Sequence, residues 1–298
     1  MLNPACPFCQ ASADTFLQGR PDYEYGLQVQ LDYHRCSSCG VVFVSPIPEE
    51  DSIGSLYGSY STHGEDSAQR RSLLARSARR LAMREFAAVA SGLKEDPVLD
   101  YGCGDGSFLG ELREAGFSRL TGYDFDPQAR LAARASGAEI AERREDLAAH
   151  GPFATITLNH VIEHVADPAQ DLAWLAGLLR PGGRLIVRTP NASSALSRVF
   201  GRSWRGWETP RHLHVFTAAG FKAFLRVPEL GGLSLVRLST SQAMFLGIFH
   251  ESLRRDVWHR PLGKLVRHGA ALASFAALSV ANRIAPVGEE LVVVLERR

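Results

Sequence analysis

The sequence has no surplus of charge of either sign. Its 298 residues include 33 Lys and Arg against 32 Asp and Glu, so the formal net charge is +1. Domains that bind nucleic acid through its phosphates usually carry a strongly basic face, and this composition supplies no strong basic field. We therefore expect no nucleic-acid partner.

Long apolar runs are also absent. The longest nearly apolar run, residues 269–281, is too short to cross a bilayer, which takes roughly 20 residues. The first ten residues lack a basic region followed by an apolar one, so we expect no secretion signal. With 45% apolar and 22% charged residues, the composition is typical of a globular protein. These features predict a cytoplasmic protein with one large domain, or one domain with an appendage.

Cysteine is scarce, yet four of the five cysteines form two C-x-x-C pairs. Cys6 and Cys9 are separated from Cys36 and Cys39 by 26 residues. In a reducing compartment this spacing predicts a four-thiolate zinc site rather than disulfides. A segment of about 45 residues has too small a core to fold without such a staple, so we expect structural zinc in a ribbon at residues 1–45. A redox role for the pairs, and a site that has lost its metal, are the alternatives.

A connector at 46–96, with a helical apolar period and several arginines at 67–91, precedes an alternation of strands and helices. The arginines either contact a substrate or form the wet face of a helix. We predict helices at 108–115, 127–136 and 168–179, the last closed by Arg180-Pro181-Gly182-Gly183, and strands at 98–101, 120–124, 155–159, 184–188, 234–240 and 290–296. This alternation predicts an α/β fold with a doubly wound parallel sheet and a ligand at the carboxyl ends of its strands.

The loop after the first of these strands carries three glycines, in the sequence VLDYGCGDGSF. Gly102, Gly104 and Gly106 are spaced G-x-G-x-G, which differs from the G-x-G-x-x-G spacing of dinucleotide-binding loops. Asp100 ends the strand and would repel a nearby phosphate. An acid there suits a ligand that carries an ammonium or a sulfonium group.

In these residues the chain resembles the class I methyltransferases that use S-adenosylmethionine. The first motif of that family is an apolar strand ending in acid-x-Gly-x-Gly-x-Gly, and the second is an acid that ends the next strand, here Asp124. The fourth-strand motif corresponds to residues 156–168 and the fifth to residues 179–185, and all four occur in order. The resemblance implies a Rossmann-like seven-stranded sheet, a methyltransferase domain at 97–298, and methyl transfer from S-adenosylmethionine.

The resemblance also implies which residues bind this cofactor. The three glycines let the backbone approach it, Asp124 accepts hydrogen bonds from the ribose hydroxyls, and Asp146 lies near the adenine amino group. Asp100 and Asn159 face the methionine portion. The complete expected set is Asp100, Gly102, Gly104, Gly106, Asp124, Phe125, Asp146 and Asn159.

Two histidine clusters are candidates for the chemistry on the acceptor, because a hydroxyl or carbon acceptor must lose a proton to a general base. The first is His160, Glu163 and His164, just past the fourth strand of the motif set. The second is Arg211, His212 and His214, in an acceptor-side loop at 191–216. We expect His164 to be the base, with His160 as a further candidate. The alternatives are that Glu163 only orients His164 and that the second cluster is a structural lid.

Each cluster resembles part of a known subfamily. In ubiquinone-pathway O-methyltransferases the first run reads Glu-x-x-Glu-His and holds a divalent metal, and here His160 replaces the first glutamate. In zinc-ribbon sugar C-methyltransferases a Glu-His pair at this place serves the acceptor. The second cluster resembles the WRG…PRHLH stretch of a bacterial branch that acts near polysaccharide or lipid pathways, with Thr217 expected to cap the following helix.

A helical insertion at 241–285 mixes apolar and basic residues, above all over 244–285. This pattern fits a peripheral contact with the inner face of a membrane, a cover over an apolar pocket, plain packing or a dimer interface. The sequence does not fix the oligomeric state.

Three function classes follow. The leading one is a methyltransferase that acts on a small-molecule, sugar, glycan or lipid-linked acceptor. The second is a zinc-ribbon RNA methyltransferase, against which residues 1–45 hold only Arg20 and Arg35 as basic residues beside four acids. The third is a non-catalytic partner that binds S-adenosylmethionine.

Overall fold

The computed structural model of the protein describes residues 3–19, 22, 26–27, 29, 31–48, 83, 86–242, 244, 248–249, 251–252 and 287–298. The strands in these parts are β1 Ala13–Leu17, β2 Tyr33–Cys36, β3 Val42–Val44, β4 Val98–Tyr101, β5 Leu120–Tyr123, β6 Glu139–Ile140, β7 Phe153–Asn159, β8 Leu179–Pro190, β9 His214–Val215, β10 Leu233–Ser241 and β11 Glu290–Arg297. The helices are α3 Ser107–Glu114, α4 Pro127–Ala133, α5 Leu147–His150, α6 Pro168–Leu178, α7 Ala195–Phe200 and α8 Ala218–Phe224, with short 3₁₀ turns between several of them.

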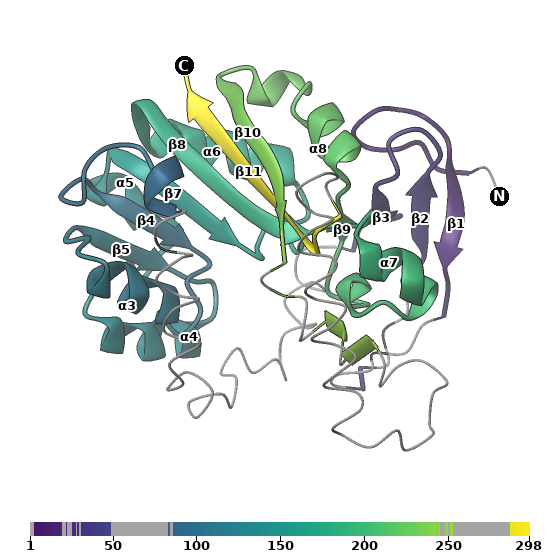
Figure 1. Ribbon diagram of the computed structural model, residues 1–298, viewed down its shortest axis with the longest axis horizontal. Helices are drawn as coiled ribbons and strands as arrows, with labels where there is room; N and C mark the ends of the chain where they lie inside the picture. The colour runs from purple at the N-terminus through teal and green to yellow at the C-terminus, as the bar shows by residue number, and fades with distance from the viewer. Residues whose placement is uncertain are drawn as a thin grey trace.

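A seven-stranded sheet forms the larger part of the molecule, in the order β10-β11-β8-β7-β4-β5-β6. The β4, β5, β6, β7 and β8 strands run parallel, and β11 is antiparallel to both of its neighbours. Figure 1 shows this twisted layer, with α3 and α4 beside β5 and α6 near β8. The predicted α/β fold with a seven-stranded sheet is therefore confirmed. The carboxyl ends of β4, β5 and β7 lie together at one edge, where the predicted cofactor loop begins.

The boundary between α6 and β8 differs from the prediction. The sequence suggested that the Pro-Gly-Gly run ends a helix and precedes a short strand, but α6 ends at Leu178 and β8 begins at Leu179. Leu179 pairs with Phe153, and the register then shifts before Arg184 pairs with Thr155. A Cβ on Gly183 would lie 2.9 Å from the carbonyl oxygen of Arg180, so the glycine lets the strand continue through this irregularity.

A second sheet joins the cysteine-containing segment to the rest of the chain, in the order β1-β2-β3-β9. Its β9 strand belongs to the acceptor-side loop, and it pairs with β3 through Val42 with Val215 and Phe43 with His214. Figure 1 shows β9 between the large sheet and the N-terminal strands. Cys6, Val41 and Phe43 share one continuous hydrophobic core with residues of the large sheet. The N-terminal segment is therefore packed into the domain rather than tethered to it.

Helix caps fix the elements on either side of these sheets. The hydroxyl of Thr217 accepts a hydrogen bond from the backbone N–H of Gly220 at 2.9 Å, which confirms Thr217 as the cap of α8. The carboxylate of Asp126 accepts the backbone N–H of Gln128 at 2.9 Å and starts α4 in the same way. Such caps satisfy N–H groups that would otherwise lack an acceptor at a helix start.

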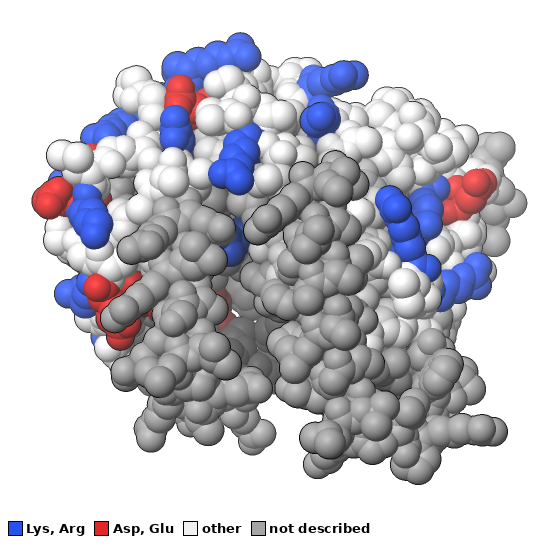
Figure 2. Space-filling model, viewed as in Figure 1, with Lys and Arg blue, Asp and Glu red and all other residues white. Residues whose placement is uncertain are grey.

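Most of the predicted connector helix at 67–91, and most of the insertion at 241–285 with its proposed membrane contact, lie outside the described residues. Within the described part, no helix combines the length and apolarity that a bilayer crossing needs. Figure 2 shows Lys and Arg in small separate groups on one face, with no continuous basic field among the described residues drawn there. The domain boundaries and the absence of a nucleic-acid partner stay predictions.

Candidate functional site

The glycine loop that follows β4 has a left-handed backbone conformation that favours glycine. Gly102, Gly104 and Gly106 have φ values of +78°, +53° and +77°, in the left-handed region that other residues rarely adopt. A Cβ on Gly102 would lie 2.3 Å from Cγ2 of Val161, and one on Gly106 would lie 2.8 Å from Cα of Ala133. A Cβ on Gly104 would meet no atom within 4 Å. Two glycines thus permit close packing, and the third borders open space.

Asp124 lies at the carboxyl end of β5 and is tied to the glycine loop. Its Oδ2 accepts the backbone N–H of Gly104 at 2.9 Å, and its Oδ1 accepts that of Asp126 at 3.0 Å. Burial raises the pKa of this carboxyl above its usual range, although the two backbone hydrogen bonds oppose that rise. Each carboxylate oxygen has a second lone pair, so both can still accept a hydroxyl of a ligand.

Asp100 is the buried penultimate residue of β4 and is bonded to the neighbouring strand β7. Its Oδ1 accepts the hydroxyl of Thr157 at 2.6 Å and the side-chain amide of Asn159 at 3.1 Å. Burial raises the pKa of Asp100 to about 7, against the effect of these two hydrogen bonds. The structure thus brings Asp100 and Asn159 together, as the sequence predicted for residues facing one part of the cofactor.

The two remaining predicted cofactor residues lie nearer the surface. Phe125 follows Asp124 and is 58% exposed. Asp146 accepts the backbone N–H of Arg143 at 3.1 Å and pairs with its guanidinium at the same distance. These contacts hold the pKa of the Asp146 carboxyl below its usual range. An adenine contact by Asp146 stays a prediction.

Two of the predicted acceptor histidines, His164 and His212, come from different loops and lie beside the buried carboxylate of Glu163. Side-chain ligand atoms of Glu163, His164 and His212 all lie within 4.8 Å of one another. The rings of His164 and His212 meet edge to face, with centroids 4.6 Å apart. Within the described part of the chain, neither oxygen of Glu163 accepts a well-formed hydrogen bond. The structure thereby joins the two clusters that the sequence placed about 50 residues apart.

Hydrogen bonds to backbone carbonyls determine which ring nitrogen carries the proton in these two histidines. Nδ1 of His164 donates to the carbonyl of Arg211 at 3.2 Å, and Nδ1 of His212 donates to that of Gly206 at 2.9 Å. Because a carbonyl can only accept, the proton shared in each of these hydrogen bonds sits on Nδ1, which leaves Nε2 as the nitrogen that can take up a proton. Burial lowers the pKa of His212 to about 4, so that ring is neutral at neutral pH.

His160 differs from these two rings in its partners, which are carboxylates and not backbone carbonyls. It has a φ of +55° at the end of β7, and it bridges two carboxylates. Its Nε2 donates to Glu290 at 2.7 Å, and its Nδ1 lies 3.3 Å from Oε1 of Glu163. Burial alone would lower the pKa of His160, but the two acids outweigh burial and raise it to about 10. The ion pair with His160 likewise overcomes burial and lowers the pKa of Glu163 to about 2.

Arg211 and His214 point away from this cluster into buried contacts. The guanidinium of Arg211 is fully buried and forms two hydrogen bonds with Asp22, at 2.8 and 3.1 Å. His214 donates from Nε2 to the carbonyl of Ala166 at 3.3 Å, and its ring packs on Phe8 with centroids 5.5 Å apart. Burial lowers the pKa of His214 to about 4. Both side chains therefore connect the acceptor-side loop to the N-terminal segment.

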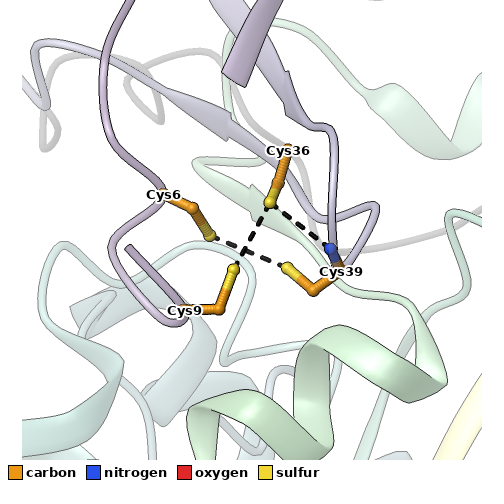
Figure 3. Close-up of side chains that lie close together, drawn as sticks. All are labelled: Cys6, Cys9, Cys36 and Cys39. Atoms are coloured by element: carbon orange, nitrogen blue, oxygen red, sulfur yellow. Dashed lines mark hydrogen bonds between the residues drawn. The ribbon is translucent and has the colours of Figure 1, made fainter. Parts of the chain in front are cut away.

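The predicted metal ligands lie together in the N-terminal segment. The sulfur atoms of Cys6, Cys9, Cys36 and Cys39 lie within 4.8 Å of one another, and Figure 3 shows all four pointing inward from two turns. The Cys6–Cys39 and Cys9–Cys36 sulfurs are 3.7 and 3.4 Å apart, too far for disulfide bonds. Four convergent sulfurs on paired turns are the donor set that structural zinc prefers, so the residues fit the ion.

Sequence reasoning missed three residues of the site, namely Asp22, Glu208 and Glu290. Glu208 is buried and pairs with Arg211 at 3.3 Å and with the guanidinium of Arg205. Burial raises the pKa of Glu208, but the nearby cations outweigh burial and hold it well below its usual range. Glu208 is adjacent to the recognised aromatic run and could have been chosen for that reason. Asp22 and Glu290 carry no local signal.

Comparison with known proteins finds a family model and relatives that are described as methyltransferases. A family model described as "Methyltransferase domain" matches residues 68–226. A ubiquinone biosynthesis O-methyltransferase of Xanthomonas euvesicatoria pv. vesicatoria is 34% identical over 158 residues, which cover 49% of this chain and 63% of that protein. The enzyme of the same name from Aromatoleum aromaticum is also 34% identical, over 47% of this chain and 62% of its own length. The chain thus spans less than two thirds of these relatives.

Among solved structures, a SAM-dependent methyltransferase from Archaeoglobus fulgidus aligns with 74% of this chain and 94% of its own, at 19% identity and a TM-score of 0.47. The family model covers more than half of the chain, from the connector through the glycine loop, both histidine clusters and α8. The protein therefore belongs to this family of methyltransferase domains.

Proposed function

We propose that the protein transfers a methyl group from S-adenosylmethionine to a small-molecule, sugar, glycan or lipid-linked acceptor, by O- or C-methylation. One contact supports this proposal above the others. Gly102 of the cofactor loop is packed so closely on Val161 that a Cβ would lie 2.3 Å from its side chain. In the sequence, Val161 lies between His160 and the Glu163-His164 pair. The glycine loop proposed for the cofactor is therefore next to the histidines proposed for the acceptor.

The residues after β4 and β5 fit S-adenosylmethionine, which supplies an electrophilic methyl group on a sulfonium. The carboxylate of Asp124 is positioned by two backbone N–H groups and retains lone pairs for two ribose hydroxyls. Asp100 places an ionisable carboxyl on the side of Asn159, where a sulfonium would favour the charged form of the acid. Open space beside Gly104 gives the cofactor access to the backbone.

His164 is the residue that we assign as general base. Its Nδ1–H is anchored on the carbonyl of Arg211, so its Nε2 is the atom that accepts a proton. Methyl transfer is an in-line displacement, and orientation of the two reactants supplies most of the catalysis. Removal of the acceptor proton by a positioned histidine contributes a further factor, typically of about 10² to 10⁴.

His160 is better suited to a fixed positive charge than to a base. With its pKa raised to about 10 by Glu163 and Glu290, the ring is already protonated at neutral pH and has no lone pair to offer. We assign it the role of holding Glu163 in its ionised form close to His164. This role also accounts for a histidine where the ubiquinone-pathway motif has a glutamate.

A divalent cation on Glu163, His164 and His212 is a second candidate for the acceptor side. It is favoured by the buried carboxylate of Glu163, which lacks a well-formed hydrogen bond in the described part of the chain. Two rings whose Nδ1–H groups are held by backbone carbonyls are typical of metal-binding histidines. A cation there would bind an acceptor oxygen and leave no base on His164. Loss of turnover on treatment with a chelator that leaves the ribbon metal in place would favour this candidate.

We further propose that the four cysteines hold structural zinc. A closed shell of four thiolates has no open position for water or substrate, so the ion contributes to folding and not to the transfer. Arg35, one of the two basic residues of the ribbon, packs over the ring of Phe16 at 3.9 Å. This position engages Arg35 in the ribbon itself and gives no support to an RNA methyltransferase.

The test uses S-adenosylmethionine with a labelled methyl group and three acceptor panels: hydroxylated aromatic compounds and sugars, a lipid extract, and RNA. Because the similar proteins are named O-methyltransferases, we expect label in a hydroxylated small molecule or lipid. Label in RNA would favour the zinc-ribbon RNA methyltransferase instead. Tight binding of S-adenosylhomocysteine without transfer to any panel would support a non-catalytic partner, and no binding at all would overturn the proposal.

A further inference from the structure

We propose that Asp22, a residue of the N-terminal cysteine segment, is a positioning residue for His164 and acts through Arg211. The inference rests on the proposed function in one respect only, the role of His164 as base. It assigns the N-terminal segment a task in the acceptor site: it fixes the tautomer and the direction of the ring that takes the proton.

The first step is the ion pair between Asp22 and Arg211. Both side chains are 0% exposed, and two parallel hydrogen bonds of 2.8 and 3.1 Å join the carboxylate to the guanidinium. A bidentate pair of this kind fixes the plane of the guanidinium as well as its position. Nε of Arg211 also contacts Glu208 at 3.3 Å. Removal of Asp22 would leave Arg211 with one buried acid in place of two, so its position would change.

The second step leads from Arg211 to His164 through the backbone. The carbonyl of Arg211 accepts the Nδ1–H of His164 at 3.2 Å, and this acceptor determines which nitrogen of the ring is protonated. The next residues are fastened beside the same histidine, because the backbone N–H groups of Leu213 and His214 donate to the carbonyl of Glu163 at 2.7 and 3.2 Å. A shift of Arg211 therefore changes the geometry of the hydrogen bond between its carbonyl and Nδ1 of His164.

The N-terminal segment holds the acceptor-side loop at further points. The backbone N–H of Val44 donates to the carbonyl of Leu213 at 2.9 Å. The next two residues of the loop, His214 and Val215, form β9 and pair with β3. The hydroxyl of Thr217 donates to the carbonyl of Cys39 at 2.6 Å. The loop is thus bonded to the N-terminal segment on one side and to His164 on the other. Asp22 adds an ion pair to these contacts.

The experiment compares Asp22→Asn with wild type in the full chain with its metal. Asp14→Asn is the matched control, because Asp14 is exposed on the same segment and its carboxylate accepts the side-chain amide of Asn3 at 3.2 Å. Proteins labelled with ¹⁵N in histidine are examined by long-range ¹⁵N–¹H correlation, with His164→Gln used to assign the ring. Wild type and Asp14→Asn should show His164 protonated on Nδ1. Asp22→Asn should show a shift of His164 toward the Nε2-protonated form.

Three further readouts separate positioning from loss of structure. Metal content and the affinity for S-adenosylhomocysteine should equal those of wild type in Asp22→Asn, because Asp124 and the cysteines are unchanged. On an acceptor found with the panels above, kcat should fall by about tenfold to a hundredfold with little change in KM. Asp22→Glu keeps the charge and should recover part of the wild-type spectrum, and it replaces Asp22→Asn if that variant does not fold.

An unchanged His164 spectrum in folded Asp22→Asn would overturn the inference. Failure of the proposed function gives a different result. S-adenosylhomocysteine would not bind to wild type, or His164→Ala would retain its turnover. In either case Asp22→Asn would still shift the ring of His164 toward the Nε2-protonated form.

Discussion

Replacing Asp100 by asparagine removes one buried charge with little change of shape. Burial raises the pKa of Asp100 to about 7, whereas an unfolded aspartate has a pKa of about 3.9. The hydrogen bonds from Thr157 and Asn159 both end on Oδ1, so the amide oxygen of Asp100→Asn can accept them in the same geometry. The substitution therefore isolates the cost of the charge.

The sign of the effect follows from proton linkage. Between these two pKa values the folded cofactor-free protein keeps a proton that the unfolded chain releases, so its stability falls as the pH rises through that window. The two values differ by an amount that corresponds to about 4 kcal/mol, of which roughly 3 kcal/mol is lost between pH 5 and pH 8. Asp100→Asn does not titrate. It should exceed wild type in stability at pH 8 and approach it at low pH.

The assay is urea unfolding of the cofactor-free protein at pH 5 and pH 8, followed by tryptophan fluorescence. Glu289 provides the internal control, because burial also raises its pKa to about 7 and its contribution should persist in Asp100→Asn. The reasoning fails if the unfolding free energies of wild type and Asp100→Asn change equally between the two pH values. The charge of Asp100 also bears on the cofactor: Asp100→Asn should weaken binding of the cationic S-adenosylmethionine more than binding of neutral-sulfur S-adenosylhomocysteine.

Three other variants test the cofactor, metal and acceptor sites. Asp124→Ala should weaken the binding of S-adenosylhomocysteine by about 10² to 10⁴ in calorimetry, since two hydrogen bonds to a charged group contribute about 1.5–3 kcal/mol each. Asp126→Asn, which keeps the α4 cap, should bind normally, and equal affinities of the two variants would contradict the ribose assignment. Cys9→Ser should lower zinc content and melting temperature while Ser38→Ala retains both, and full zinc in Cys9→Ser would exclude the four-thiolate site. His164→Ala should reduce turnover by about 10² to 10⁴ at unchanged cofactor affinity, and near-normal turnover would transfer the role of base elsewhere or show that no base is needed.

The parts of the fold that depend on short-range pattern were predictable. The strands at β4, β5 and β7 follow from apolar runs that end at acids or at an amide, and the caps at Asp126 and Thr217 follow from a polar residue before a helical period. The start of β8 was missed because a Pro-Gly-Gly run normally ends a helix. Here pairing with Phe153 on β7 extends the strand through it.

The sequence by itself determined the motifs whose chemistry lies within a few residues: the left-handed glycine loop, the acid after the second strand of the large sheet, and the two cysteine turns. Local backbone geometry and side-chain type are sufficient there. Only the tertiary structure decided the partners of Arg211 and His160. Asp22 meets Arg211 across 189 residues, and Glu290 meets His160 across 130. No periodicity links residues so far apart. Their ion pairs form because the folded core buries the charges together, and a buried charge requires a partner.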